Sequence, residues 1–455
     1  MSRADSRLDG KRVTRRGDAG GHLAVFTSPR TAVASPRARL LSAFKKDTQA
    51  RKVYLAGREY YGEDGKTYEL DLVGKIKQQL SNDPTFHPEY PSSLGLREFT
   101  RQATEVALGK SSPSILENRV LGVQTPGFIA AVRLGAELLK HWYDGAAWCG
   151  PVYLASPCDG ATTSDLAVSS ISSIRFFILI LAADSLAGVF RAAGIQDIRR
   201  YCYWDDKRRG VCLERLLEDL ERAPERSAVV LSASAQYPTG ADLSQNQWAV
   251  ITQLMARRGL VPFLLLPAQG LCYGDLQRDA WPVQHCQSQG IQLFCAQSFS
   301  HCFGLYGEAV GHLLCILKQN SLLLSVKSQA DKIVSSLWAQ PSAGGAHVVA
   351  TVLSNSAHLV EWQGEVKHMV ERCMLIRAVL REKLRLLGTP GCWNHLTQQG
   401  GLFCCTGLND HQVEFLSNRR HVYLLPSGCL NMSAINGRNL DYVAESIHLA
   451  VTTSL

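Results

Sequence analysis

Short apolar runs that alternate with helical stretches are the feature that most limits how this chain can fold. Four such runs, each bounded by turn-forming residues, occupy 152–155, 228–231, 260–266 and 291–295. A helical stretch from 244 to 258 lies between two of them. Runs that are apolar on both faces are typical of parallel strands covered by helices on each side. The middle of the chain therefore predicts an α/β domain built on a mostly parallel sheet.

A long helix is predicted near the C-terminal end of the chain. Apolar residues recur at steps of three or four positions from 359 to 387, and Gly388 and Pro390 end the pattern. The short runs at 401–406 and 422–425 that follow are typical of a smaller α+β unit. Because a helix of this length commonly links two domains, we expect a large α/β domain and a small α+β domain.

Positive charge is concentrated at the N-terminal end. Residues 1–52 hold 13 Lys or Arg and 4 Asp, whereas the rest of the chain holds 35 basic and 36 acidic side chains. The body therefore lacks the basic field that nucleic acid requires, and we expect no nucleic-acid partner. Residues 1–21 have almost nothing apolar to bury and predict a disordered basic extension. No apolar run approaches the roughly 20 residues of a membrane span, so we expect no membrane partner.

The 14 cysteines form no Cys-x-x-Cys pair, and the N-terminus lacks the apolar stretch of a secretory signal. These features favour buried, reduced thiols and a cytoplasmic location. One group of metal-ligand residue types is clustered in sequence, but its gaps fit no structural zinc pattern. We therefore expect no metal at this group, which consists of His285, Cys286, Cys295, His301 and Cys302.

A family motif lies just after the fourth apolar run. Residues 296–300 read Ala-Gln-Ser-Phe-Ser, and 303–308 read Phe-Gly-Leu-Tyr-Gly-Glu. With further matches from about residue 51 to the C-terminus, such as Pro-Thr-Gly at 238–240, the chain resembles the aspartate aminotransferases, and within them a divergent cytoplasmic paralogue. These are fold-type-I enzymes that use pyridoxal phosphate. The resemblance implies a large domain with a mostly parallel sheet of the seven-stranded type, a smaller α+β domain and a homodimer.

The resemblance also implies where the domains divide. The small domain would combine 22–67 with 356–455, and the large cofactor-type domain would span 68–355. Against the family pattern, an insertion of about 24 residues is expected at about 160–183. Its Ser/Thr-rich start and apolar end match neither the helical nor the strand period, so a surface loop whose apolar end packs elsewhere is the alternative.

The position of the family's reactive lysine, directly after Ser-Phe-Ser, is His301 in this chain. Transamination needs a primary amine that forms a Schiff base with the cofactor and then carries a proton. Imidazole is a competent general base near neutral pH but has no primary amine. The family also keeps the pyridine nitrogen protonated with a buried Asp, and Leu265 stands at that position. The resemblance thus implies that pyridoxal phosphate, if bound, is not held covalently.

Other positions that contact cofactor or substrate in the family also differ here. The family's two carboxylate-binding arginines correspond to Cys429 and Ser335, neither of which forms the bidentate pair of a guanidinium. The residues around the cofactor ring differ as well: Ala268 stands for a tyrosine, Tyr237 for an asparagine, and Asp159 or Ala183 for a tryptophan. These replacements remove both cofactor and substrate contacts.

The phosphate-binding positions are only partly kept. Those that remain are Gly127, Ser298, Ser300 and Tyr90. Ile129 replaces the family's threonine and Ala309 replaces its phosphate arginine. Ordinary turn chemistry explains the two serines equally well, and interface packing explains Tyr90. A hydrogen-bonded core histidine is the corresponding explanation for His301.

Three functions are compatible with this pattern. The first is the family reaction, from aspartate and 2-oxoglutarate to oxaloacetate and glutamate. The second is a non-catalytic paralogue that keeps the fold and pairs with itself or with an active paralogue. The third is a module that binds a phosphorylated ligand. Because catalytic and binding positions depart together while turns and core runs stay family-like, the second interpretation is favoured.

Overall fold

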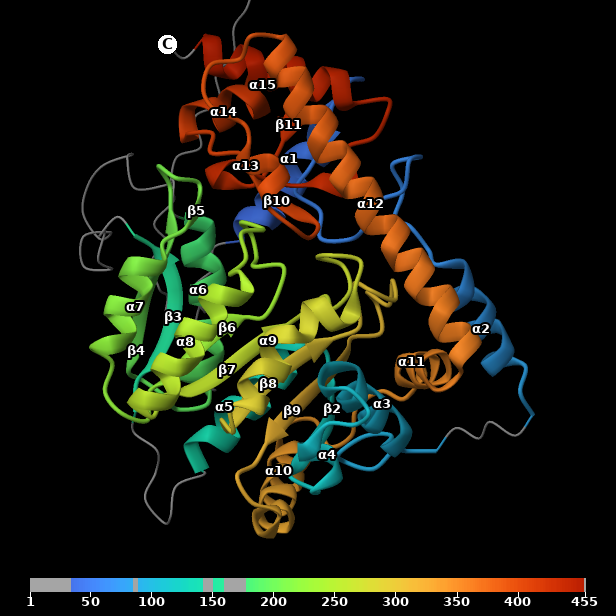
Figure 1. Ribbon diagram of the computed structural model, residues 1–455. Helices are drawn as coiled ribbons and strands as arrows, with labels where there is room; N and C mark the ends of the chain where they lie inside the picture. Colours follow the sequence, from blue (N-terminus) through green and yellow to red (C-terminus); the bar gives the residue numbers. More distant parts are fainter. Residues whose placement is uncertain (1–33, 85–88, 142–149, 159–176, 454–455) are drawn as a thin grey trace, which may run out of the picture. The chain divides into compact units, whose positions relative to one another are not determined.

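A mixed eight-stranded sheet forms the centre of the region Pro36–Leu455 (Figure 1). The computed structural model describes residues 34–84, 89–141, 150–158 and 177–453. In spatial order the strands are β2 (Val120–Pro126), β9 (Val310–Ile316), β8 (Leu293–Ser298), β7 (Val261–Leu266), β6 (Ala228–Ser232), β3 (Val152–Pro157), β4 (Ile198–Asp205) and β5 (Gly210–Val211). Each of the four predicted runs falls on one of these strands.

Strands β8, β7, β6, β3 and β4 pair in parallel, as the sequence predicts. Strand β9 runs antiparallel between β2 and β8, and the two-residue β5 is antiparallel to β4. Without β5 the sheet has the seven strands that the resemblance implies. The α/β fold class with a mostly parallel sheet is confirmed.

Helices cover both faces of this sheet. Successive residues of β7 point to opposite sides, so Phe263 and Leu265 join one buried cluster while Leu264 and Leu266 join the other. The first cluster is closed by α5 (Phe128–His141), α6 (Phe177–Ala192) and α10 (Leu323–Leu337). The second is closed by α3 (Arg97–Leu108), α7 (Leu213–Glu221), α8 (Gln245–Arg258) and α9 (Leu276–Ser288). Burial on both faces explains why these strands are apolar throughout.

The predicted long helix is α12 (Ser356–Leu386), which Figure 1 shows leading to the C-terminal elements. Arg377 of α12 is fully buried, and its guanidinium donates to the carbonyls of Leu396, Gly401 and Phe403. The elements after α12 are α13 (His395–Gln398), β10 (Phe403–Cys405), α14 (Asp410–Arg419), β11 (Val422–Tyr423), β12 (Cys429–Asn431) and α15 (Leu440–Thr452).

An N-terminal strand joins these C-terminal elements. Strand β1 (Val53–Tyr54) pairs in parallel with β11, and β10 pairs antiparallel with β12. Three further helices of the N-terminal half and one before α12 complete the order: α1 (Pro36–Lys46), α2 (Asp71–Ser81), α4 (Pro113–Leu116) and α11 (Gly344–Ser354). The exact domain boundaries stay a prediction, and the expected extension at 1–21 lies outside the described residues.

The expected insertion at about 160–183 stays a prediction, and the structure corrects only the expectation that its apolar end is irregular. Residues 159–176 lie outside the described part, but α6 is helical from Phe177 onward. The end that we predicted to be irregular is therefore helix. Its residues are apolar on every side, from Phe177 to Ala183, and such a sequence hides the helical period.

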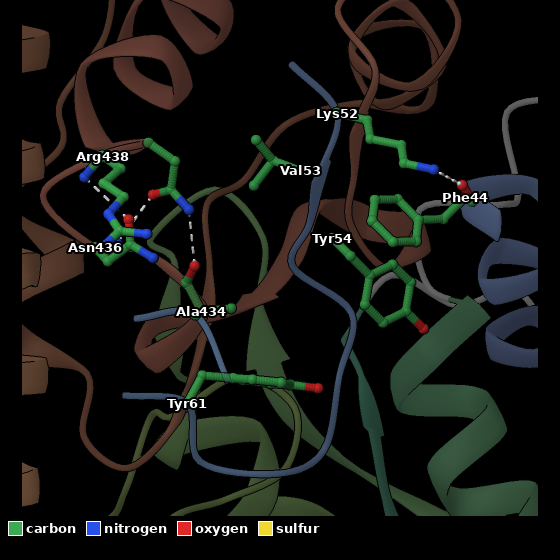
Figure 2. A pocket seen from close by; sticks show the side chains of 10 residues that line it. Phe44, Lys52, Val53, Tyr54, Tyr61, Ala434, Asn436 and Arg438 are labelled. Atoms are coloured by element: carbon green, nitrogen blue, oxygen red, sulfur yellow. Dashed lines mark hydrogen bonds between the residues drawn. The ribbon is translucent and has the colours of Figure 1, made fainter. Parts of the chain in front are cut away.

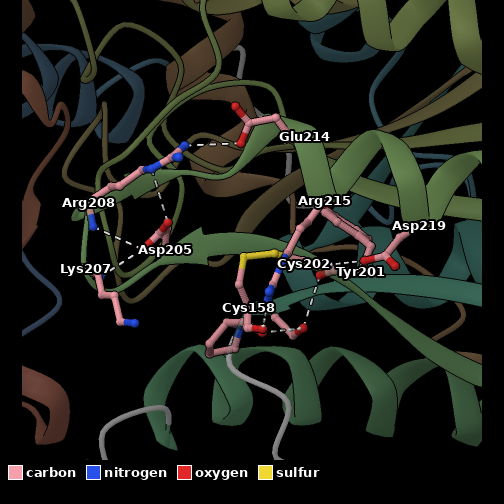
Figure 3. The surroundings of a disulfide bond; sticks show 11 residues. Cys158, Tyr201, Cys202, Asp205, Lys207, Arg208, Glu214, Arg215 and Asp219 are labelled. Atoms are coloured by element: carbon pink, nitrogen blue, oxygen red, sulfur yellow. Dashed lines mark hydrogen bonds and ion pairs between the residues drawn. A yellow bond between two sulfur atoms is a disulfide. The ribbon is translucent and has the colours of Figure 1, made fainter.

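A disulfide corrects the expectation that all cysteines are reduced. Cys158 directly follows β3, Cys202 lies on the neighbouring strand β4, and their sulfur atoms are bonded (Figure 3). The sulfur of Cys212 lies within 4.8 Å of both. Among the other described cysteines, all except Cys392 are buried. Adjacent strands bring two residues far apart in sequence together, which spacing alone does not reveal.

Among the residues that the structure describes, no helix combines the length and the apolar character needed to cross a membrane.

Candidate functional site

The turn after β8 places His301 at the carboxyl edge of the parallel strands. Strand β8 ends at Ser298, and the Phe299 N–H then donates to the Val310 carbonyl at 3.0 Å. The Ser300 N–H donates to Ser298 Oγ at 3.3 Å. Ligands of open α/β sheets bind at this edge, so the position of His301 is that of a site residue.

The imidazole of His301 is held in its neutral form. Its Nδ1 atom is buried and has no hydrogen-bond partner in the described part of the chain. Burial lowers the pKa of His301 below its usual value, and the nearby charge of Arg37 lowers it further, while Glu59 acts in the opposite direction. The ring lies edge-on to Tyr306, with centroids 5.8 Å apart. A neutral imidazole offers one acceptor and one donor to a ligand.

Polar side chains from distant parts of the sequence are connected to this imidazole. The charges of Arg37 and Glu59 act on it, and the Tyr306 ring packs against it. Tyr237 is hydrogen-bonded to Arg37, and Tyr61 to Glu59. We call them the His301 cluster: Arg37, Glu59, Tyr61, Tyr237, His301 and Tyr306. Tyr61 Oη donates to a Glu59 carboxylate oxygen at 2.9 Å, and the Tyr60 N–H donates to Tyr306 Oη at 2.9 Å. Burial raises the pKa of Tyr306 to about 12, so its hydroxyl stays protonated. The cluster thus contains one cation, one carboxylate and several neutral hydroxyls.

Arg37 comes from helix α1, and sequence reasoning did not find it. Its Nε donates to the Ala56 carbonyl at 2.8 Å, and its Nη2 donates to Tyr237 Oη at 2.9 Å. The Tyr237 ring in turn packs edge-on against Phe403, with centroids 4.9 Å apart. The two partners Arg37 and Tyr237 are 200 positions apart in the chain, and no local pattern indicates such a contact.

The remaining replaced positions offer little charge. Leu265 is 8% exposed and pairs with Ala296 in the sheet, with its side chain in an apolar cluster. Cys429 of β12 is 1% exposed. It lies close enough to Tyr237 to add to the rise in the pKa of that hydroxyl, which is caused mainly by burial. Ala268 is half-buried and has only its backbone carbonyl engaged, by the Leu271 N–H. None of these three side chains has a carboxylate or a guanidinium group.

Three of the four positions expected to hold phosphate, Gly127, Ser298 and Ser300, lie near the ends of β2 and β8. Thr125 of β2 and Ser298 of β8 both pair with Gly311 of β9, which places Gly127 next to the end of β8. Gly127 has φ +88°, and a Cβ on it would lie 3.4 Å from the Cβ of Ala309. Because Ala309 stands there, this group has backbone and hydroxyl donors but no side-chain cation. Ile129, at the start of α5, is 51% exposed.

Two expected residues lie apart from the His301 cluster in the single chain. Tyr90 is 89% exposed, and Ser335 is an exposed residue of α10. By resemblance both would serve a neighbouring subunit, and exposure in one chain is compatible with that role.

A cavity of 340 Å³ adjoins the cluster and shares Tyr61 with it (Figure 2). Its cationic side chains are Lys52 and Arg438, and no carboxylate lines it. Lys52 Nζ donates to the carbonyls of Phe44 and Asp47, whereas Arg438 is exposed. The lining of this cavity is therefore positively charged.

Comparisons with known proteins agree with this architecture. Residues 177–447 match the family model described as aminotransferase class I and II. The chain is 42% identical over 91% of its length to the cytoplasmic aspartate aminotransferase of Gallus gallus, and covers 95% of it. It is 34% identical over 90% of its length to a Homo sapiens protein named, provisionally, cytoplasmic aspartate aminotransferase 2, and covers 90% of it.

A solved aminotransferase structure has the same fold. An aromatic-amino-acid aminotransferase from Burkholderia pseudomallei, covalently bound to pyridoxal phosphate, superimposes with a TM-score of 0.83 at 28% identity. The match covers 94% of this chain and 99% of that one.

Proposed function

Because the chain belongs to the class I and II aminotransferases, we propose that it is an aspartate-aminotransferase-like protein whose own site has lost transamination of aspartate. The observation that carries this proposal is His301 at the position of the reactive lysine. A neutral imidazole accepts or donates a proton, but it has no primary amine with which to hold a carbonyl cofactor. The relatives' names support a cytoplasmic location, which we propose with the function.

The residues around His301 do not fit pyridoxal phosphate bound as a covalent cofactor. When bound, this group supplies an electron sink through its protonated ring nitrogen. Leu265 has no charge with which to keep that nitrogen protonated, and Ala309 provides no cation for the phosphate. Leu265 also lies in an apolar cluster, where an unpaired charge would be costly to bury. We therefore propose that any binding of this cofactor is weak and non-covalent.

The residues at the substrate-binding positions support the same proposal. Cys429 is buried and Ser335 is exposed, and neither side chain carries a charge that pairs with a dicarboxylate. Charge-assisted hydrogen bonds are worth roughly 1.5 to 3 kcal/mol each, so their loss weakens aspartate binding strongly.

A reduction experiment tests the proposal. The purified chain would be incubated with pyridoxal phosphate, its visible spectrum recorded, and the mixture treated with borohydride before peptide mapping. We expect no visible absorbance of an internal Schiff base and no reduced adduct. A reduced adduct mapped to a lysine, or aspartate turnover at rates typical of the chicken relative, would contradict the proposal. That relative, treated in parallel, is the positive control.

A role as a dimer partner is the second candidate, and the exposure of Tyr90 favours it. In the family each subunit lends residues to its neighbour's site. This chain would lend Tyr90 and Ser335, so an active partner in a mixed dimer would bind dicarboxylates more weakly. Co-expression of the two chains with different tags, followed by purification on both tags, tests this. Recovery of no mixed dimer, or unchanged aspartate affinity in it, would overturn it.

A further inference from the structure

Arg37 brings a guanidinium into a site whose expected arginines are absent. We propose that Arg37 anchors the carboxylate of a small monocarboxylic 2-oxo acid with an apolar side chain, bound non-covalently at the His301 cluster. This inference rests on the proposed function, because it takes the site to be free of a covalently held cofactor.

The hydrogen bonds of Arg37 leave part of its guanidinium available. A guanidinium has five N–H donors, and the two bonds to Ala56 and Tyr237 use two of them. Both acceptors are neutral oxygens. Among the residues that the structure describes, no carboxylate lies within ion-pair distance of Arg37. An anionic ligand would supply the carboxylate partner that this half-buried guanidinium lacks among the described residues.

The one carboxylate of the cluster is engaged by donors other than Arg37. Glu59 accepts hydrogen bonds from Tyr61 Oη at 2.9 Å and from the Arg58 N–H at 3.0 Å. Burial is the largest influence on the pKa of His301 and lowers it, so the ring is neutral at pH 7; the charge of Glu59 opposes this shift, and that of Arg37 adds to it. An incoming carboxylate therefore meets the positive charge of Arg37 beside a neutral imidazole that is able to donate to a 2-oxo oxygen.

The surroundings favour a ligand with a single carboxylate. Cys429, which influences Tyr237 electrostatically, provides no second cation, and Ser335 lies exposed on α10. The neighbours of Arg37 and His301 are aromatic instead: Tyr237, which accepts from Arg37, packs against Phe403, and Tyr306 packs against His301. A second carboxylate would lose its hydration without gaining a partner, which makes a dicarboxylate the poorer ligand.

Isothermal titration calorimetry on the purified full chain tests this. The ligands are 4-methyl-2-oxopentanoate, with one carboxylate, and 2-oxoglutarate, with two. We expect the first to bind the unmodified chain more tightly than the second. Arg37→Gln should weaken its binding at least 10-fold, whereas Arg37→Lys should recover part of the affinity because the charge returns.

Two matched variants provide the controls. Arg39→Gln removes an exposed arginine of the same helix, and Arg438→Gln removes one of the two cations of the neighbouring cavity. Both should bind as the unmodified chain does, and thermal melting would show that all variants are folded. Equal binding by Arg37→Gln, loss of binding in Arg438→Gln instead, or no binding by the unmodified chain would overturn the inference. The borohydride experiment is read separately: a lysine adduct contradicts the proposed function, whatever Arg37→Gln does.

Discussion

His301 and His312 lie only eleven positions apart in the chain, yet their surroundings differ in kind. His312 is fully buried on β9, its Nδ1 atom lies 2.7 Å from Gln297 Oε1, and its ring meets the edge of Phe99. His301 is only half-buried and lies near Arg37 and Glu59. Burial lowers the pKa of both imidazoles, so a lowered pKa alone does not identify a site. Charged neighbours distinguish the two, and only His301 has them.

The region around His312 has a structural role that explains its buried polarity. Gln297 donates from Nε2 to the Ala103 carbonyl at 3.3 Å, and Gln269 donates to the carbonyls of Val106 and Leu276. These amides join the sheet to α3 and α9. The Gln269 and Gln297 amides are bonded within the protein, although Nε2 of His312 has no hydrogen-bond partner among the described residues. The His301 cluster differs because it contains the charged side chains Arg37 and Glu59.

The largest expected effect comes from removing His312. His312→Ala should lower the free energy of unfolding by about 3 kcal/mol, because it leaves a cavity and an unpaired Gln297 amide oxygen. His301→Ala should cost less than about 1 kcal/mol, since His301 makes no hydrogen bond through Nδ1. Urea denaturation of both variants measures the difference. Equal losses would show that His301 is also a core residue.

Acid should destabilise the protein through the buried histidines. Burial lowers the pKa of His312 to about 3 and, with the charge of Arg209, that of His395 to about 4. The unfolded chain binds protons below about pH 6.5 while these folded imidazoles do not, so their contribution is complete above that pH and is lost as the pH falls. At pH 5 the loss is about 2 kcal/mol for each. Urea denaturation between pH 8 and pH 4 should show a shallower fall for His312→Leu.

The smallest expected effect is on activity. His301→Lys returns the primary amine, but aspartate turnover should stay far below that of the chicken relative, because Leu265 and Cys429 remain. A coupled assay for oxaloacetate measures it, with the unmodified chain as baseline. Turnover near the relative's rate would show that the single lysine explains the difference between the two histidine regions.

The sequence predicted the strands that are continuous apolar runs. It did not predict the strands whose apolar residues are interrupted by charged, polar or glycine residues. Strand β4 contains Arg199 and Arg200, and β9 contains Gly311 and His312, so neither forms a continuous apolar run. The resemblance located His301, but no pattern indicated Arg37. Its partner Tyr237 lies 200 positions away, and only the folded chain brings the two together.

The bond between Cys158 and Cys202 closes a loop of the chain whose ends are 44 positions apart, and helix α6 lies inside it. A protease that cut within α6 would therefore leave two fragments joined by sulfur. On a non-reducing gel the nicked protein would migrate as one species, and thiol treatment would separate it into two. Intactness of this protein is thus to be judged under reducing conditions, where a single cut becomes visible.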